Sequence, residues 1–152
     1  MRVLPVKKGK RDYLSLLLLA DPEPRMIDRY LDRGELWVLE DGGKVRSLCV
    51  VTDEGEGICE LKNLATGEED QRKGYGTALV EEMARRYASR FHTMVVGTGE
   101  SPLTIPFYEK LGFVVFRREE GFFTRNYPDP IWEAGQLLTD MIYLRRRLGE
   151  ER

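Results

Sequence analysis

A turn rich in glycine and in cations lies where an apolar stretch gives way to an amphipathic one. Residues 72–76 read Arg-Lys-Gly-Tyr-Gly, they follow an apolar run that begins at Ile58, and apolar side chains recur at helical spacing from Leu79 onward. Glycine lets a ligand approach the main chain, and the first amides of a helix have no internal partners. Since the helix dipole also makes this end positive, the pattern predicts an anion site, best suited to phosphate, on the amides of residues 72–77.

Common nucleotide-binding motifs do not account for this turn. The dinucleotide fingerprint requires a third glycine, which is missing here. The other common phosphate loop requires Gly-Lys-Ser or Gly-Lys-Thr, which does not follow. The phosphate hypothesis therefore stands without either motif, and a tight turn with a solvated basic flank is the alternative.

Three segments carry a resemblance to a known family. Gln71-x-x-Gly74-x-Gly76 resembles the Gln/Arg-x-x-Gly-x-Gly/Ala turn of the GNAT superfamily of N-acetyltransferases, and residues 63–66 (Asn-Leu-Ala-Thr) resemble its strand four. Residues 107–113 (Phe-Tyr-Glu-Lys-Leu-Gly-Phe) are similar to its Phe-Tyr-x-x-x-Gly-Phe segment. The glycine-bearing turn and the segment at residues 107–113, found in the right order, are together much more specific than either one alone. The likeness is best over residues 36–116.

The resemblance implies a binding site for acetyl-coenzyme A (acetyl-CoA) as co-substrate, and no metal. The pyrophosphate would bind the amides of residues 72–77, and the pantetheine arm would lie where strands four and five splay apart, between residues 64–66 and 96–98. A main-chain amide near Leu64 or Ala65 would polarise the thioester oxygen. The residues expected to contact the donor are Leu64, Ala65, Thr66, Gln71, Arg72, Lys73, Gly74, Tyr75, Gly76, Thr77, Thr98 and Ser101.

Two side chains are the catalytic candidates that the resemblance implies. Tyr108 occupies the position of the family's usual acid, which protonates the departing sulfur, and a core or rim tyrosine is the alternative. Glu60 lies on the strand-four run, where the family often places a carboxylate that acts as a base through water. For Glu60, pairing with a cation such as Lys62 or Arg46 is the alternative.

The sequence says less about the acceptor. Ser101 stands where the family commonly has an asparagine that touches the donor, and a serine can either donate that hydrogen bond or cap a helix. An acidic and aromatic set near the end of the chain could bind a cationic amine, although exposed acids beside a packed tryptophan would give the same pattern. This set comprises Asp129, Trp132, Glu133 and Asp140.

Composition and charge indicate one domain, residues 1–152, with a net charge of -2 that does not favour binding of nucleic acid. Cys49 and Cys59 lie in apolar runs and predict buried, inert thiols. Two cysteines and one histidine argue against a disulfide framework or a zinc site. The basic and apolar start lacks the cleavage pattern of a secretory signal, and no run reaches membrane-spanning length. We expect a cytoplasmic protein without a membrane partner, and leave the formation of a homodimer open.

The hydrophobic pattern, with the resemblance, predicts a single-domain α/β (α+β) protein of the acyl-CoA N-acyltransferase fold. Its central mixed, mostly antiparallel sheet is flanked by helices, and strands four and five are parallel and splayed. The expected strands are residues 2–7 at an edge, 35–39, 44–52, a strand from 58, 93–96, 113–117 and 139–147, with a helix as the alternative for the last. The expected helices are residues 12–20 with Asp12 as N-cap, 25–33 ended by Gly34, 77–89, and 101–111 with its regular part from residue 104; residues 121–130 are a long connection.

The resemblance implies transfer of an acetyl group from acetyl-CoA to a primary amine of a small molecule or peptide. The amine would attack directly within a ternary complex, because no side chain is well placed as a covalent nucleophile. A non-catalytic acyl-CoA binding or sensing module on the same fold is the first alternative, and it predicts donor binding without turnover. A nucleic-acid or protein-interaction domain that uses Arg72, Lys73 and residues 145–147 is the second, although the acidic net charge argues against it.

Overall fold

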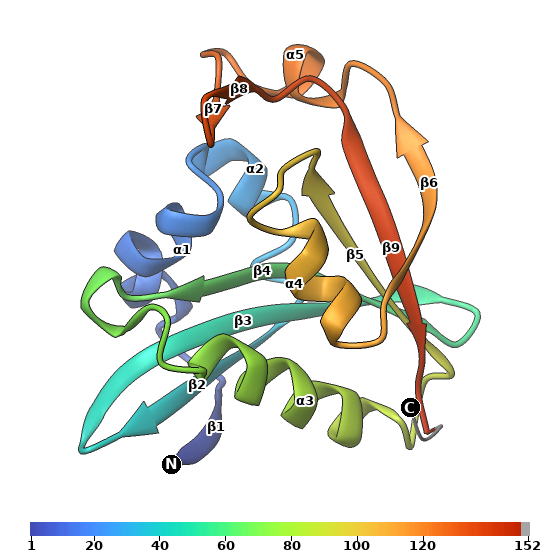
Figure 1. The fold of residues 1–152 in the computed structure, drawn as a ribbon. Coiled ribbons are helices and arrows are strands. Elements are labelled where there is room, and N and C mark those ends of the chain that lie inside the picture. Colours follow the sequence, from blue (N-terminus) through green and yellow to red (C-terminus); the bar gives the residue numbers. More distant parts are fainter. Residues whose placement is uncertain (150–152) are drawn as a thin grey trace.

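A seven-stranded sheet forms the centre of the computed structural model, which describes residues 1–149. The strands follow the order β1-β2-β3-β4-β5-β9-β6 (Figure 1), and all neighbours are antiparallel except the parallel pair β4 and β5. This confirms the predicted mixed, mostly antiparallel sheet. The strands are β1 (Arg2–Val6), β2 (Glu35–Asp41), β3 (Lys44–Gly55), β4 (Ile58–Thr66), β5 (Thr93–Gly99), β6 (Val114–Glu119) and β9 (Met141–Arg147), and β7 (Trp132–Glu133) pairs with β8 (Gln136–Leu137) in a separate hairpin.

Strands β2, β3 and β4 form the predicted antiparallel meander. The turn between β2 and β3 contains Gly42 and Gly43, whose φ angles are 63° and 77°. A two-residue hairpin turn of this kind needs positive φ at both positions, which glycine adopts without strain. Along β4, buried residues alternate with partly exposed ones, so that its side chains point by turns to the two faces of the sheet.

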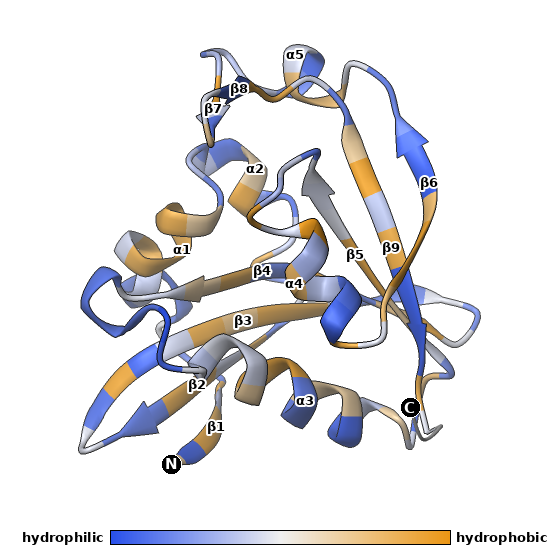
Figure 2. Ribbon diagram, in the orientation of Figure 1, coloured by the Kyte–Doolittle hydropathy of each residue, from blue (hydrophilic) through white to orange (hydrophobic). Residues whose placement is uncertain are grey.

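Two helices cover one face of the sheet and carry the sequence motifs. α3 (Tyr75–Tyr87) and α4 (Ile105–Lys110) contribute buried side chains such as Leu79, Met83 and Tyr108 to a core shared with β3, β4 and β5. Figure 2 shows hydrophobic and hydrophilic residues alternating along α3, and hydrophobic residues through much of β3. The apolar face of α3 packs against the sheet, and this packing holds the first turn of the helix beside the end of β4.

The opposite face is covered by the N-terminal helices. A 3-10 turn, η1 (Lys10–Tyr13), leads into α1 (Leu14–Ala20), and α2 (Pro24–Asp28) follows a short loop. Leu17 and Ile27 are fully buried in a second core against this face. The loop between α1 and α2 is thus held close to the sheet, which matters because it contributes to the site described below.

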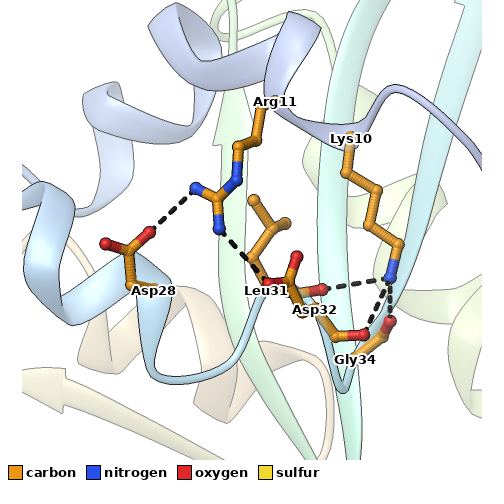
Figure 3. Close-up of polar contacts among 6 residues, drawn as sticks. All are labelled: Lys10, Arg11, Asp28, Leu31, Asp32 and Gly34. Atoms are coloured by element: carbon orange, nitrogen blue, oxygen red, sulfur yellow. Dashed lines mark hydrogen bonds and ion pairs between the residues drawn. The ribbon is translucent and has the colours of Figure 1, made fainter.

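Lys10 and Arg11 fasten η1 to the segment that follows α2 (Figure 3). The Lys10 ammonium donates to the carbonyl oxygens of Leu31 at 3.0 Å, Asp32 at 3.4 Å and Gly34 at 2.6 Å. The Arg11 guanidinium bridges Asp28 and Asp32, at 2.8 and 3.4 Å. One cation therefore binds three carbonyl groups of the turns that follow α2.

Replacing Lys10 by methionine should lower the free energy of unfolding by about 2 kcal/mol, because charged hydrogen bonds to carbonyls of the buried residues Leu31 and Gly34 would be lost. Urea denaturation followed by circular dichroism measures the change. Lys8→Met is the matched control, since Lys8 is exposed and its loss should leave the midpoint unchanged. Equal midpoints for the two variants would show that the Lys10 contacts do not stabilise the fold.

The N-terminal helices differ from the sequence prediction. The helix expected over residues 12–20 is a 3-10 turn followed by α1, and the prediction of Asp12 as N-cap is wrong because no side-chain cap bond forms at either start. The helix expected over residues 25–33 ends at Asp28 and continues as turns. Gly34 closes this segment, where a Cβ atom would lie 2.6 Å from Val50 Cγ1 and 2.8 Å from the Tyr30 oxygen, so that only glycine allows the close approach.

The C-terminal part contains structure that the sequence did not reveal. The connection predicted over residues 121–130 contains the short helix α5 (Phe122–Asn126), and the β7–β8 hairpin follows it. In Figure 1 this segment lies near α2, above the C-terminal end of β5. The final strand is confirmed as β9, and the alternative of a helix there is wrong. α4 starts at Ile105 with Pro106 in its first turn, as expected.

Candidate active site

A cleft opens where β4 and β5 part. The two strands pair only along Ile58–Leu61 and Thr93–Val96, although β4 continues to Thr66 and β5 to Gly99. Beyond these pairs the facing edges do not bond to each other, so their main-chain groups can bind an extended ligand. The cleft has a volume of about 570 Å³.

Several separate parts of the chain build the walls of this cleft. Four of the predicted site residues line it, namely Leu64, Gln71, Thr98 and Tyr108. The other lining residues come from the end of α1 and the loop after it, from β4 and β5, from the N-cap of α4, from the segment around α5, β7 and β8, and from the start of β9. They are Leu19, Ala20, Asp21, Pro22, Leu61, Lys62, Asn63, Gly99, Thr104, Phe123, Tyr127, Ile131, Trp132, Glu133, Leu138 and Met141.

The predicted anion site is the start of α3, close to the end of β4. Gly74 precedes the helix with φ 88°, and no side chain caps the first amides. Arg72 also has a positive φ, 65°, and is exposed, as is Lys73. The first turn of α3 therefore offers free amides next to two cations, which is the arrangement that binds phosphate groups.

Side-chain hydrogen bonds fix the turn that leads to α3. Gln71 donates through Nε2 to the Thr66 carbonyl at 3.2 Å, which ties the turn to the last residue of β4. Asp70 is buried and accepts a hydrogen bond from Arg46 at 3.0 Å. Tyr75 donates through its hydroxyl to Asp41 at 2.8 Å. The turn is thus held in place by side chains, while the amides of α3 that follow it remain free.

A bulge in β4 lies at the bottom of the cleft. The register with β3 shifts so that Val50 faces Asn63 and Val51 faces Leu61, which leaves Lys62 as the extra residue. Later in β4, Ala65 and Thr66 stay paired with β3 and do not line the cleft. A bulge redirects main-chain groups beside it, which suits the predicted polarising amide near Leu64 or Ala65.

Tyr108 brings a hydroxyl group to the cleft from α4. The residue is 8% exposed, and its ring packs edge-on against Phe107 and Phe113 at centroid distances of 5.0 and 5.6 Å. No hydrogen bond from residues 1–149 engages its hydroxyl. Burial raises the pKa of Tyr108, so the phenol keeps its proton at neutral pH and can donate it.

Glu60 lies on β4 next to the cleft but is not among its lining residues. Its carboxylate is 3.2 Å from the Lys62 ammonium, and its side chain is 14% exposed. Burial raises the pKa of Glu60, and the charge of Lys62 opposes this shift. The structure therefore contains the ion pair that the sequence offered as an alternative, and a carboxylate whose pKa is moved toward the working range of a base.

Thr98 lines the cleft near α4, and Ser101 lies in the turn that leads into this helix. The Thr98 hydroxyl donates to the Thr104 hydroxyl at 2.7 Å. Ser101 is buried, and its Oγ accepts from the Leu103 amide at 3.1 Å. Ser101 therefore orders the turn that leads into α4 and does not line the cleft, and the alternative that it caps this helix is wrong, because the N-cap is Thr104 and no side chain caps it.

The acidic and aromatic set near the end of the chain separates into two groups. Trp132 and Glu133 line the cleft through the β7–β8 hairpin. Asp140 instead bonds to Arg118 at 2.6 Å and to the Gly121 amide at 2.9 Å, which orders the start of α5. Asp129 borders a smaller neighbouring hollow.

Sequence reasoning missed Asp21, Asn63 and Tyr127 as site residues. Asp21 accepts a hydrogen bond from Tyr127 at 2.9 Å, which joins residues 106 positions apart. Asn63 was noted only as part of the strand-four segment. The one sequence signal near Asp21 was the proline-rich loop at residues 21–24. Such a loop can lie over a ligand site, but its sequence gives no information about long-range partners.

Neither cysteine lines the cleft. Cys49 and Cys59 are buried and free, and burial raises the pKa of Cys59 to about 12, which confirms the prediction of inert thiols. Within residues 1–149, no three His, Cys, Asp or Glu side chains are grouped so as to hold a metal ion. Every helix in that range is too short or too polar to cross a lipid bilayer.

Comparison with known proteins identifies the class of this protein. The family model described as an acetyltransferase (GNAT) domain matches residues 32–115. YvbK of Bacillus subtilis, described as an uncharacterized N-acetyltransferase, is 32% identical over 151 residues, which cover 95% of this chain and 96% of the relative. The chain therefore belongs to the GNAT family and is an acyltransferase of that type.

Solved structures agree with this membership and with the predicted fold. A GNAT family acetyltransferase from Elizabethkingia anophelis with acetyl-CoA bound is 34% identical, covers 97% of both chains and superposes with a TM-score of 0.92. A Bacillus subtilis acetyltransferase in complex with CoA is 31% identical, with 97% of this chain and 98% of that chain covered and a TM-score of 0.90.

Proposed function

We propose that this protein transfers the acetyl group of acetyl-CoA to a primary amine by direct attack in a ternary complex. The observation that carries the proposal is the cleft between β4 and β5, whose lining includes Gln71, from the turn before the uncapped start of α3, and Tyr108 of α4. Two similar structures were solved with acetyl-CoA or CoA bound, which supports this choice of donor.

The parted strands and the uncapped helix start fit the two ends of such a donor. The amides of residues 72–77, with Arg72 and Lys73, would hold the pyrophosphate. The free edges of β4 and β5, near Leu64 and Thr98, would bind the pantetheine arm by main-chain hydrogen bonds. Acetyl-CoA supplies the acetyl group as a thioester when it is bound.

The side chains then divide the proton transfers. Glu60 takes a proton from the amine through a water molecule, which leaves a lone pair on nitrogen for attack. An amide near Leu64 or Ala65 stabilises the charge on the carbonyl oxygen. As the carbon–nitrogen bond forms and the carbon–sulfur bond breaks, the nitrogen loses a second proton to solvent and becomes an amide. Tyr108 gives its proton to the sulfur and regains one from solvent.

A panel of acceptors tests the proposal directly. Release of free CoA thiol would be followed with small amines, peptides and aminoglycosides, and mass spectrometry would look for an acceptor that is one acetyl group heavier. Acetylation of at least one amine is expected. Tight donor binding without turnover of any acceptor would instead indicate the non-catalytic acyl-CoA binding module.

Reversing both exposed cations at the turn, with Arg72→Glu and Lys73→Glu, should weaken CoA binding at least about tenfold. Each exposed charge contact contributes up to about 1 kcal/mol, and about 1.4 kcal/mol corresponds to a factor of ten in affinity. The loss should shrink at high salt, because salt screens exposed charges. Calorimetry measures the affinity.

Lys7→Glu combined with Lys8→Glu is the matched control for this pair, since it makes the same change in net charge at exposed positions outside the turn. The control should bind CoA as the unmodified protein does. Equal losses in both double variants would mean that overall charge, and not the turn, governs binding.

A further inference from the structure

Asp21 is a buried carboxylate in the wall of the cleft. It is 8% exposed and accepts hydrogen bonds from the hydroxyls of Tyr30, at 3.2 Å, and Tyr127, at 2.9 Å. The amide of Glu23 donates at 3.4 Å. A carboxylate can accept about four hydrogen bonds, so these three donors leave capacity for one more.

All donors to Asp21 are neutral, and no cation within residues 1–149 forms an ion pair with it. A buried charge without a counter-charge is costly, and burial raises the pKa of Asp21 in spite of its hydrogen bonds. The two tyrosines and one amide nevertheless favour the ionised form. A cationic group that entered the cleft would supply the missing counter-charge.

Asn63 provides a second, independent sign of an absent donor. It is 4% exposed, and its Nδ2 donates to the Leu17 carbonyl at 3.1 Å and to the Tyr30 hydroxyl at 3.0 Å. Because a carbonyl only accepts, this pair of bonds fixes which way the amide points. Its Oδ1 is then left buried without a hydrogen-bond partner in the part of the chain that the structure describes.

The two residues belong to one hydrogen-bonded row in the cleft wall. Asn63 donates to the Tyr30 hydroxyl, which in turn donates to Asp21. Both ends of this row have acceptor capacity that residues 1–149 do not fill. A group rich in N–H donors and positively charged, such as an alkylammonium, matches both the charge and the hydrogen-bonding needs.

Other residues that line the cleft complement a cation on an apolar stem. Trp132 is 66% exposed and lines the cleft together with Tyr127 and the carboxyl-bearing Glu133. Aromatic faces attract alkylammonium groups, and Glu133 adds a second negative charge. Ile131 and Leu138 also line the cleft and offer apolar surface for a carbon chain.

We propose that the acceptor is a diamine or polyamine, and that Asp21 binds an ammonium group other than the amine that is acetylated. The proposal rests on the function proposed above. An ammonium paired with a carboxylate holds its proton more firmly, which makes it a poor nucleophile. The nitrogen at Asp21 is therefore the anchor, and the second amine of the same molecule is the one presented to the thioester.

The test compares cadaverine with aminopentanol, which has the same chain length but a hydroxyl in place of one ammonium. The unmodified protein should acetylate cadaverine with a kcat/KM at least about tenfold higher, mainly through a lower KM, because a buried charge contact is lost with aminopentanol. Asp21→Asn should abolish this preference. Calorimetry of cadaverine with the CoA-loaded protein should show the same loss of affinity without any turnover.

Asp28→Asn is the matched control, because it removes an exposed carboxylate from α2 outside the cleft and should keep the preference. A preference that persists in Asp21→Asn would overturn the proposal. So would equal kcat/KM for the two amines in the unmodified protein, a result that does not depend on whether the variant folds. Failure of the unmodified protein to acetylate any amine would instead count against the proposed function itself.

Discussion

Replacing Tyr108 by phenylalanine should lower kcat by about 10²- to 10⁴-fold while CoA affinity stays unchanged. The range is what a positioned general acid contributes. The change removes only a hydroxyl that has no hydrogen-bond partner within residues 1–149, so the core around Phe107 and Phe113 should keep its packing. Steady-state kinetics and calorimetry with CoA, carried out on the same preparation, separate turnover from binding.

Tyr13→Phe removes a hydroxyl outside the cleft and is the control for this variant. Because burial raises the pKa of Tyr108, the proton remains in place well into the alkaline range, so the unmodified protein should show no loss of rate from ionisation of this group near neutral pH. A Tyr108→Phe variant with the turnover of the unmodified protein would remove Tyr108 from the mechanism.

Replacing Glu60 by glutamine should lower kcat/KM by a similar factor and change its pH dependence. A base acts when it is deprotonated, so the rate falls as the pH falls through its pKa. Since burial raises the pKa of Glu60, the acid limb of the profile should lie above the ordinary glutamate value of about 4.3. The glutamine variant should lose this limb. A profile of kcat/KM against pH measures both effects.

A second variant makes the assignment of this limb specific. The Lys62 charge lowers the pKa of Glu60, so Lys62→Met should move the acid limb to higher pH. Glu56→Gln, at an exposed turn position, should leave it in place. An acid limb that survives unchanged in Glu60→Gln would transfer the role of base to another group, and the buried Asp21 would be the next carboxylate to examine.

The sequence predicted those parts of the site whose signals are local. The positive-φ turn at Gly42 and Gly43, the amphipathic α3 and the glycine-bearing turn before it all depend on residues close together in the chain. The order strand, helix, strand was enough to predict that β4 and β5 are parallel. The helix predicted around Tyr108 is present as α4, because Pro106 lies in its first turn, where proline is tolerated.

Parts of the site that depend on distant partners could not be predicted. Asp21 becomes a buried carboxylate only because Tyr30 and Tyr127 reach it from two other segments. The β7–β8 hairpin has strands of two residues, too short to give a hydrophobic alternation, and its turn uses Ala134 at φ 52°, which no propensity favours. The hairpin that brings Trp132 to the cleft could therefore not be predicted from the sequence.

Calorimetry of CoA and of pantetheine with the unmodified, folded protein tests the central claim most directly, namely that the free amides at the start of α3 hold a pyrophosphate. The two ligands share the thiol arm, but only CoA carries the phosphate groups. We predict saturable binding of CoA and at least about tenfold weaker binding of pantetheine, since contacts to charged groups are the stronger hydrogen bonds. No uptake of CoA, or equal affinity for the two ligands, would contradict it.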